Sequence, residues 1–207
     1  MCEKCYNEIK SLPEPHCRIC EKPLDTDATA ICRECFERKN YFSYTRAAGT
    51  YEGALKEMIH FFKFNKKKKL FKLLSETMLD KIDRNIFNGI DLIVPAPLSK
   101  KSLAEREYNQ TELLAKHISF RLKIPANNIV VKTRETERQS SLERGKRLGN
   151  LKGAFKIKEE FISIVDGKNI VVVDDVYTTG STINEIAKVL VKAGAKEVRA
   201  VTVARAV

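Results

Sequence analysis

The sequence lacks a long hydrophobic segment. None of its apolar runs approaches the roughly 18 residues that a helix needs to cross a bilayer, which argues against a transmembrane protein. The first residues also lack the apolar stretch and the small-residue cleavage site of a signal peptide, so we expect a cytoplasmic protein. A chain of 207 residues with 43% hydrophobic content is long enough for one ordinary domain with a buried core plus a small additional module, or for two small domains.

Cysteine is absent after residue 35. The six cysteines form three identical pairs, Cys2-x-x-Cys5, Cys17-x-x-Cys20 and Cys32-x-x-Cys35, with eleven residues between successive pairs. Because cytoplasmic thiols stay reduced, this pattern predicts metal binding rather than disulfides. Two successive pairs supply four thiolates at the spacing of a zinc ribbon, and the spacing alone does not choose between the first two pairs and the last two. His16 is either a substitute ligand or a bystander.

Acidic residues are outnumbered, with 27 Asp and Glu against 38 Lys and Arg, which leaves a net charge of +11. Such an excess favours polyanionic partners, namely nucleic acid, anionic lipid or a small molecule with several phosphates, although it also serves solubility alone. The basic run Lys66–Lys69 either binds phosphates or the anionic surface of the inner membrane, or is a solvated face. A second basic group, which either closes over a substrate, contacts DNA or is solvated, comprises Arg134, Arg138, Arg144 and Arg147.

The apolar pattern divides the chain into a cysteine-rich head (residues 1–40), a connecting strand with amphipathic helices (41–88) and a region of alternating strands and helices (89–207). This alternation predicts an α/β fold with a mostly parallel sheet flanked by helices, which binds ligands at the carboxyl ends of its strands. The predicted strands are Ser43–Tyr51, Asp91–Val94, Ile129–Val131, Phe155–Ile157, Asn169–Val173 and Val198–Val203. The predicted helices are Glu52–Phe64, Leu70–Ile82, Thr111–Leu122 and Thr182–Ala193, the last closed by Gly194, and residues 133–152 are predicted to form a long mobile loop.

One segment, Val171-Val-Val-Asp-Asp-Val-Tyr-Thr-Thr-Gly-Ser-Thr182, carries most of the predicted chemistry. An apolar strand ends in two adjacent carboxylates, which can accept hydrogen bonds from sugar hydroxyls or hold a divalent ion through water. A turn rich in hydroxyls then leads into a helix, whose unpaired N–H groups and positive dipole end suit a phosphate. Gly180 allows close approach of the backbone. No Gly-Lys-Ser/Thr follows, so this is not a Walker P-loop.

This segment resembles the 5-phosphoribosyl-diphosphate signature of type I phosphoribosyltransferases. The resemblance implies that Asp174 and Asp175 hold the ribose 2- and 3-hydroxyls, that Thr178–Thr182 wrap the 5-phosphate, and that Mg²⁺ accompanies the diphosphate. It also implies the type I phosphoribosyltransferase fold. The implied ligand-binding residues of the segment are Asp174, Asp175, Val176, Tyr177, Thr178, Thr179, Gly180, Ser181 and Thr182.

Further segments are similar to the ComF (ComFC-like) competence family. They are Val94–Lys101, Arg106–Gln110, and Arg147–Asn150 with Gly153–Phe155 after Gln139. Together with the cysteine-rich head, the resemblance covers nearly the whole chain. In the Ser99-Lys100-Lys101 loop, backbone N–H groups and lysines can face a diphosphate, or the loop is an exposed basic turn.

The same resemblance bears on the cysteines. Cys20–Leu24 is similar to the first knuckle of the family and Cys32–Phe36 to the second, which implies a structural zinc ion on Cys17, Cys20, Cys32 and Cys35. Many members of the family carry four Cys-x-x-Cys pairs, whereas this chain has three.

Two functions compete. The first is a ComF-type competence protein that binds 5-phosphoribosyl diphosphate or a related phosphoribosyl ligand and assists uptake of transforming single-stranded DNA beside the competence helicase or translocase. The cysteine-rich head and the net charge favour it. The second is an active phosphoribosyltransferase of nucleotide metabolism, which breaks the bond between ribose C1 and diphosphate through an oxocarbenium-like transition state. The intact diphosphate signature favours it, but no residue identifies the acceptor nucleophile or a catalytic group.

Overall fold

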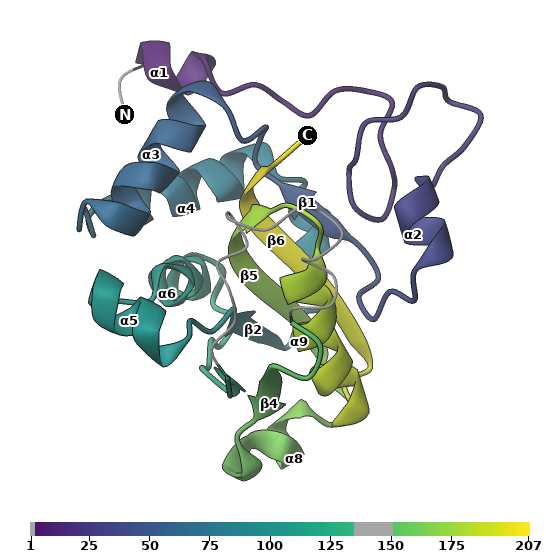
Figure 1. Cartoon of the computed structure of the whole chain (residues 1–207), viewed down its shortest axis with the longest axis vertical. Helices are drawn as coiled ribbons and strands as arrows, with labels where there is room; N and C mark the ends of the chain where they lie inside the picture. The colour runs from purple at the N-terminus through teal and green to yellow at the C-terminus, as the bar shows by residue number, and fades with distance from the viewer. Residues whose placement is uncertain (1–2, 135–150) are drawn as a thin grey trace.

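A parallel β-sheet forms the centre of the protein (Figure 1). The computed structural model describes residues 3–134 and 151–207. The sheet has four strands in the order β1 (Thr45–Ala47), β6 (Glu197–Arg205), β5 (Asn169–Tyr177) and β2 (Leu92–Pro95), and each neighbouring pair is parallel. The predicted α/β fold with a mostly parallel sheet is therefore confirmed.

Helices cover both faces of the sheet, because its central strands are apolar on both sides. In β5, Val171 and Val173 pack toward one buried cluster, whereas Ile170 and Val172 pack toward another. A strand buried on both faces is typical of parallel sheets, which explains the uninterrupted apolar run that identified β5. The first cluster is completed by helices α3 (Gly53–Phe64), α4 (Leu70–Lys81) and α6 (Gln110–Leu122). The second is completed by helix α9 (Ser181–Lys192).

Several predicted boundaries shift. Strand β5 continues to Tyr177, four residues beyond the predicted end, because β6 pairs with it as far as Tyr177 and Arg205. Strand β1 is only three residues long, because its parallel partner β6 accompanies it over Thr45–Ala47 alone. Helix α9 (Ser181–Lys192) begins and ends one residue before its predicted bounds, and Gly194 follows its C-cap with a φ of +97° and donates its N–H to the carbonyl of Val191.

Two predicted strands pair outside the main sheet. Strands β3 (Val130–Lys132) and β4 (Phe155–Ile157) form a separate antiparallel pair, with Val131 opposite Lys156. The buried side chains of this pair, Val130 and Phe155, belong to the same cluster as α9. Most of the predicted long loop that joins the two strands, residues 135–150, lies outside the described residues, and with it lie Arg138, Gln139, Arg144 and Arg147.

The Ser99–Lys101 segment is not a loop. Helix α5 (Lys100–Arg106) begins there, and the Ser99 side chain caps it by accepting a hydrogen bond from the N–H of Ser102 at 3.2 Å. No residue of α5 is buried, so the helix leaves no apolar periodicity in the sequence. Other short helices that the pattern does not reveal are α1 (Glu3–Asn7), α2 (Arg33–Glu37), η1 (Arg84–Phe87), η3 (Glu159–Phe161) and α8 (Ile162–Val165).

The cysteine-rich head packs directly on the sheet side that carries α9. Cys17, Cys20, Cys32 and Cys35 are buried in the same cluster as the residues of β5 and α9. Backbone hydrogen bonds shape the first knuckle, since the N–H of Cys17 donates to the carbonyl of Lys22 and the N–H of Glu21 donates to that of Cys17. Among residues 3–134 and 151–207, no helix has the length and apolar character to cross a membrane.

Candidate functional site

A cavity of about 480 Å³ opens at the carboxyl ends of β5 and β2. Its floor carries Asp174 and Asp175 from the end of β5, and one wall carries the first turn of α9. The opposite side is formed by the end of α3 and by α5. The cavity therefore lies where parallel α/β sheets bind their ligands.

The two carboxylates of β5 have different surroundings. Asp175 accepts a hydrogen bond from Lys63, at the end of α3, with 2.7 Å between Nζ and Oδ1, and the two side chains are only 16% and 13% exposed. Asp174 accepts the N–H of Asp175 at 2.8 Å. The pKa of Asp174 is raised to about 7, first by burial and then by the neighbouring charge of Asp175, against the opposing effects of the Asp175 N–H, Lys63 and Arg106. The ion pair thus leaves Asp174 as the carboxyl that holds a proton near neutral pH.

The phosphate turn, which we define as Thr178–Thr182, has a backbone that requires glycine. Gly180 has a φ of +72°, and a Cβ built on it would lie 2.1 Å from the hydroxyl oxygen of Tyr177. The turn runs straight into α9, whose first N–H groups have no partner within the helix. The hydroxyls of Thr179 and Ser181 are 2.8 Å apart. These donors at the start of a twelve-residue helix make the turn suitable for an anion.

The structure brings most of the predicted ligand-binding residues together. Those that line the main cavity are Asp174, Asp175, Val176, Thr178, Thr182 and Ser99. Tyr177, Gly180 and Ser181 border a smaller adjoining hollow. Thr179 lines neither space. Lys100 and Lys101 are exposed on the first turn of α5 and do not line the cavity.

Other cations in the cavity were not predicted. Lys63, Arg106 and Lys132 all line it. The Arg106 guanidinium lies 5.2 Å from the ring centroid of Phe64, another lining residue, and donates a hydrogen bond to Gln110 at 3.2 Å. Arg106 belongs to one of the segments that resemble the ComF family, so a signal for it was present. Lys63 gave no signal, because only its long-range contact with Asp175 distinguishes it from the many other lysines.

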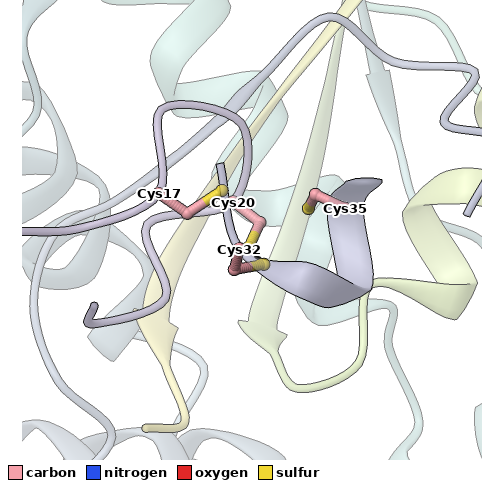
Figure 2. Close-up of side chains that lie close together, drawn as sticks. All are labelled: Cys17, Cys20, Cys32 and Cys35. Atoms are coloured by element: carbon pink, nitrogen blue, oxygen red, sulfur yellow. Dashed lines mark hydrogen bonds between the residues drawn. The ribbon is translucent and has the colours of Figure 1, made fainter. Parts of the chain in front are cut away.

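The head carries a second candidate site. The Sγ atoms of Cys17, Cys20, Cys32 and Cys35 all lie within 4.8 Å of one another, and Figure 2 shows them gathered between the first knuckle and α2. The Sγ atoms of Cys20 and Cys32 are 3.7 Å apart. A tetrahedral zinc site with Zn–S bonds of about 2.3 Å has S–S edges of ~3.8 Å, so the four thiols could hold such an ion. Cys5 lies outside this group, and Cys2 is not among the described residues.

The buried thiols influence one another. The Cys35 thiol donates to Cys20 and lowers the pKa of Cys20 to about 5, whereas the same contact raises the pKa of Cys35. Burial raises the pKa of Cys32. One thiolate therefore forms readily, but four thiolates in so small a buried volume require a cation.

Comparison with known proteins bears on the region that contains β5 and α9. Residues 110–206 match the family model "Phosphoribosyl transferase domain". Together with the parallel sheet flanked by helices, this match identifies the type I phosphoribosyltransferase fold that the sequence predicted.

Relatives extend the likeness to the whole chain, including the head. It is 34% identical over 214 residues to competence protein F of Haemophilus influenzae, an alignment that covers 100% of this chain and 90% of that protein. The DNA utilization protein YhgH of Escherichia coli is 30% identical over 201 residues, covering 88% and 87% of the two chains. The competence protein ComFC of Streptococcus pneumoniae is 29% identical over 207 residues, covering 99% and 87%.

The raised pKa of Asp174 predicts how stability depends on pH. Because the folded-state pKa of about 7 exceeds the ordinary value of 3.8, the folded protein binds this proton more tightly than the unfolded chain, and stability falls as the pH rises toward and through 7. Asp174→Asn removes the buried charge. We expect its stability relative to the wild type to increase between pH 5 and pH 8, by on the order of 2 kcal/mol in urea unfolding.

Asp80→Asn is the matched control, because Asp80 is exposed on α4. Its stability relative to the wild type should stay constant over the same pH range. A relative stability of Asp174→Asn that is flat, or that decreases toward pH 8, would contradict the assignment of the protonated carboxyl.

Proposed function

Because the chain belongs to the ComF family of competence proteins, we propose that its phosphoribosyltransferase-type domain binds 5-phosphoribosyl diphosphate together with Mg²⁺. The observation that carries this proposal is the order of groups along Asp174–Thr182. Two carboxylates stand at the end of a buried strand, and a turn rich in hydroxyls follows directly and leads into the N-terminus of α9. This order matches a sugar with a diol at one end and a phosphate at the other.

Each part of the ligand has a partner in the cavity. Asp174 and Asp175 accept hydrogen bonds from the ribose hydroxyls, and the phosphate turn binds the 5-phosphate. The diphosphate lies toward Lys63 and Arg106, which line the cavity where the predicted Lys100 and Lys101 do not. Mg²⁺ would add positive charge at the diphosphate, and the carboxylates among the residues that line the cavity, Asp174 and Asp175, could hold it through water.

The ion pair between Lys63 and Asp175 has a consequence for binding. When a ribose hydroxyl donates to Asp175, Lys63 is released toward the diphosphate, so one buried ion pair is exchanged for two interactions with the ligand. Lys63 therefore pairs with Asp175 before the ligand binds and with the diphosphate after it has bound.

The head holds a structural zinc ion on Cys17, Cys20, Cys32 and Cys35. Four thiolates fill all four coordination positions of a tetrahedral zinc ion, so no position remains for a substrate or a catalytic water, and the zinc is structural. Zinc binding stabilises a segment of the chain with few apolar residues of its own.

The second part of the proposed function is the handling of single-stranded DNA during uptake, beside the helicase or translocase of the competence machinery. The names of the relatives, competence protein and DNA utilization protein, support it. So does a basic and aromatic surface that we define by Phe61, Phe64 and Lys66–Lys69. Phe61 is 44% exposed and Phe64 is 54% exposed, and the lysines follow them directly. Exposed rings stack on bases and lysines attract the phosphates.

Phosphoribosyl transfer is a second candidate. Besides the acid pair, the cavity is lined by the aromatic side chains of Tyr51, Phe64 and Phe155, which can contact a flat acceptor. Release of diphosphate in the presence of nucleobases or other nitrogen nucleophiles would establish this activity, whereas tight binding without turnover favours a ligand-sensing role.

Binding of 5-phosphoribosyl diphosphate is tested by titration calorimetry with Mg²⁺. Asp175→Asn should weaken binding tenfold to a hundredfold, because a charge-assisted hydrogen bond contributes roughly 1.5–3 kcal/mol. Gly180→Val should weaken it further, since valine resists a φ of +72° and its side chain would collide with Tyr177.

Controls separate the site from general strain. Gly89→Val imposes a similar strain, at a φ of +68°, but lies outside the cavity and should bind as the wild type does. Absence of binding to the folded wild type, or equal binding by all variants, would reject the pocket.

One zinc ion per chain is expected from the thiol geometry. Metal analysis of purified Cys17→Ser should show loss of zinc, because three thiolates and a hydroxyl form a weaker set, whereas Cys2→Ser and Cys5→Ser should retain it. Zinc retained by Cys17→Ser and lost from Cys2→Ser would overturn the assignment.

Binding to single-stranded DNA should be independent of sequence and should weaken steeply with salt, because released counterions drive it. Charge reversal of Lys67 and Lys69 should reduce binding to an oligonucleotide. Reversal of two exposed lysines elsewhere, Lys192 at the end of α9 and Lys196 just before β6, should leave binding largely intact. An isotherm that is unchanged between low and high salt, or no binding at low salt, would remove this partner.

A further inference from the structure

The phosphate turn is held from behind by a residue of the head. Arg38, which follows α2, donates from Nη1 to the carbonyl oxygen of Thr179 at 2.7 Å and from Nη2 to the hydroxyl of Tyr177 at 3.4 Å. These contacts join residues that are 141 and 139 positions apart in the sequence. Thr179 itself lines no part of the cavity, so Arg38 approaches the turn from outside the ligand space.

The contact with Thr179 fixes the direction of a donor. The carbonyl of Thr179 and the N–H of Gly180 belong to one planar trans peptide, in which the two groups point in opposite directions. When Arg38 holds the carbonyl on the side of the head, the Gly180 N–H points away from the head. A flip of this peptide would break the hydrogen bond from Arg38 to the Thr179 carbonyl, and the Tyr177 hydroxyl, which Arg38 also contacts, lies close to Gly180.

Arg38 is in turn fixed by the cysteine cluster. Its Nε donates to the side-chain oxygen of Asn40 at 3.0 Å, and the Asn40 amide donates to the carbonyl of Cys35 at 2.8 Å. Since Cys35 is one of the four clustered thiols, only one side chain, Asn40, separates the metal site from Arg38.

The same segment is also tied to helix α9. The N–H of Tyr41 donates to the Asn184 side chain at 2.8 Å, and the Asn184 amide donates to the carbonyl of Lys39 at 3.2 Å. Asn184 lies in the first turn of α9, and its own N–H donates to the carbonyl of Gly180 at 2.8 Å. The segment from Arg38 to Tyr41 therefore contacts both the phosphate turn and the helix start that completes it.

We propose that Arg38 is a positioning residue for the phosphate turn, through which the metal-bound head sets the affinity of the turn for a 5-phosphate. This inference rests on the proposed function, since it concerns the same pocket. It assigns the head a role at the ligand site in addition to its stability.

The experiment compares Arg38→Ala, Arg38→Lys and Arg33→Ala in the full-length, zinc-loaded protein. Arg33 is the matched control, because it begins the helix α2 that Arg38 follows, its side chain is 87% exposed, and it pairs with Glu37 on the surface. Zinc content is measured for each variant and should remain at the wild-type value, because Arg38 is not a ligand.

The probes are ribose 5-phosphate, 5-phosphoribosyl diphosphate with Mg²⁺, and inorganic diphosphate with Mg²⁺. Arg38→Ala should weaken the two probes that carry a 5-phosphate by tenfold to a hundredfold and leave inorganic diphosphate unchanged. Arg38→Lys should recover part of the loss, because an ammonium can reach the Thr179 carbonyl but cannot contact Tyr177 in the same fork. A general loss of structure would weaken all three probes alike.

Amide hydrogen exchange without ligand provides an independent test. Arg38→Ala should speed exchange at Gly180–Thr182, whereas Arg33→Ala should not. Unchanged exchange, or wild-type affinity of Arg38→Ala for ribose 5-phosphate, would overturn the inference. If the wild type binds none of the probes, the proposed function fails, and the exchange measurement still decides whether Arg38 holds the turn.

Discussion

Strand β5 is the element on which the rest of the site depends. It is paired on both edges, by β2 and β6, and its apolar residues are buried on both faces of the sheet. The sheet thereby carries two carboxylates into a poorly solvated position at the end of the strand. Such groups are costly unless they are paired or protonated, and the protein does both, with Lys63 beside Asp175 and a raised pKa for Asp174. Two carboxyl groups are thus held side by side at the cavity, where their oxygens can accept hydrogen bonds from a polyhydroxyl ligand.

The cysteine cluster depends on the same strand from the other side. The four thiols share a buried cluster with Tyr177 at the end of β5 and with α9, so the head is packed on the domain rather than tethered to it. Tyr177 lies between two cations of different origin, since Arg38 donates to its hydroxyl and the Arg205 guanidinium lies 4.7 Å from its ring centroid. The head is therefore packed against the end of β5, and Arg38 contacts the phosphate turn without lining the cavity.

Sequence patterns within single segments predicted the strands and helices that have a continuous or periodic apolar surface. The apolar runs of β5 and β6 and the periodicity of α9 reveal buried elements, and Asp174–Thr182 carries a motif with a physical meaning of its own. Helix α5 escaped prediction because it buries no side chain. Lys63 and Arg38 escaped because their roles arise from contacts over 112 and 141 residues, which only the folded chain brings together. Lys100 and Lys101 were expected at the cavity, because the sequence did not reveal helix α5, on which both side chains are exposed.

The central claim is that the end of β5 and the start of α9 form a binding site for 5-phosphoribosyl diphosphate. A crystal structure of the protein grown with this ligand and Mg²⁺ tests it most directly. The account predicts the ribose hydroxyls within hydrogen-bond distance of Asp174 and Asp175, the 5-phosphate against the N–H groups of Thr178–Thr182, and Lys63 turned from Asp175 toward the diphosphate. A ligand bound elsewhere, or bound in this cavity with its 5-phosphate away from the turn, would contradict it.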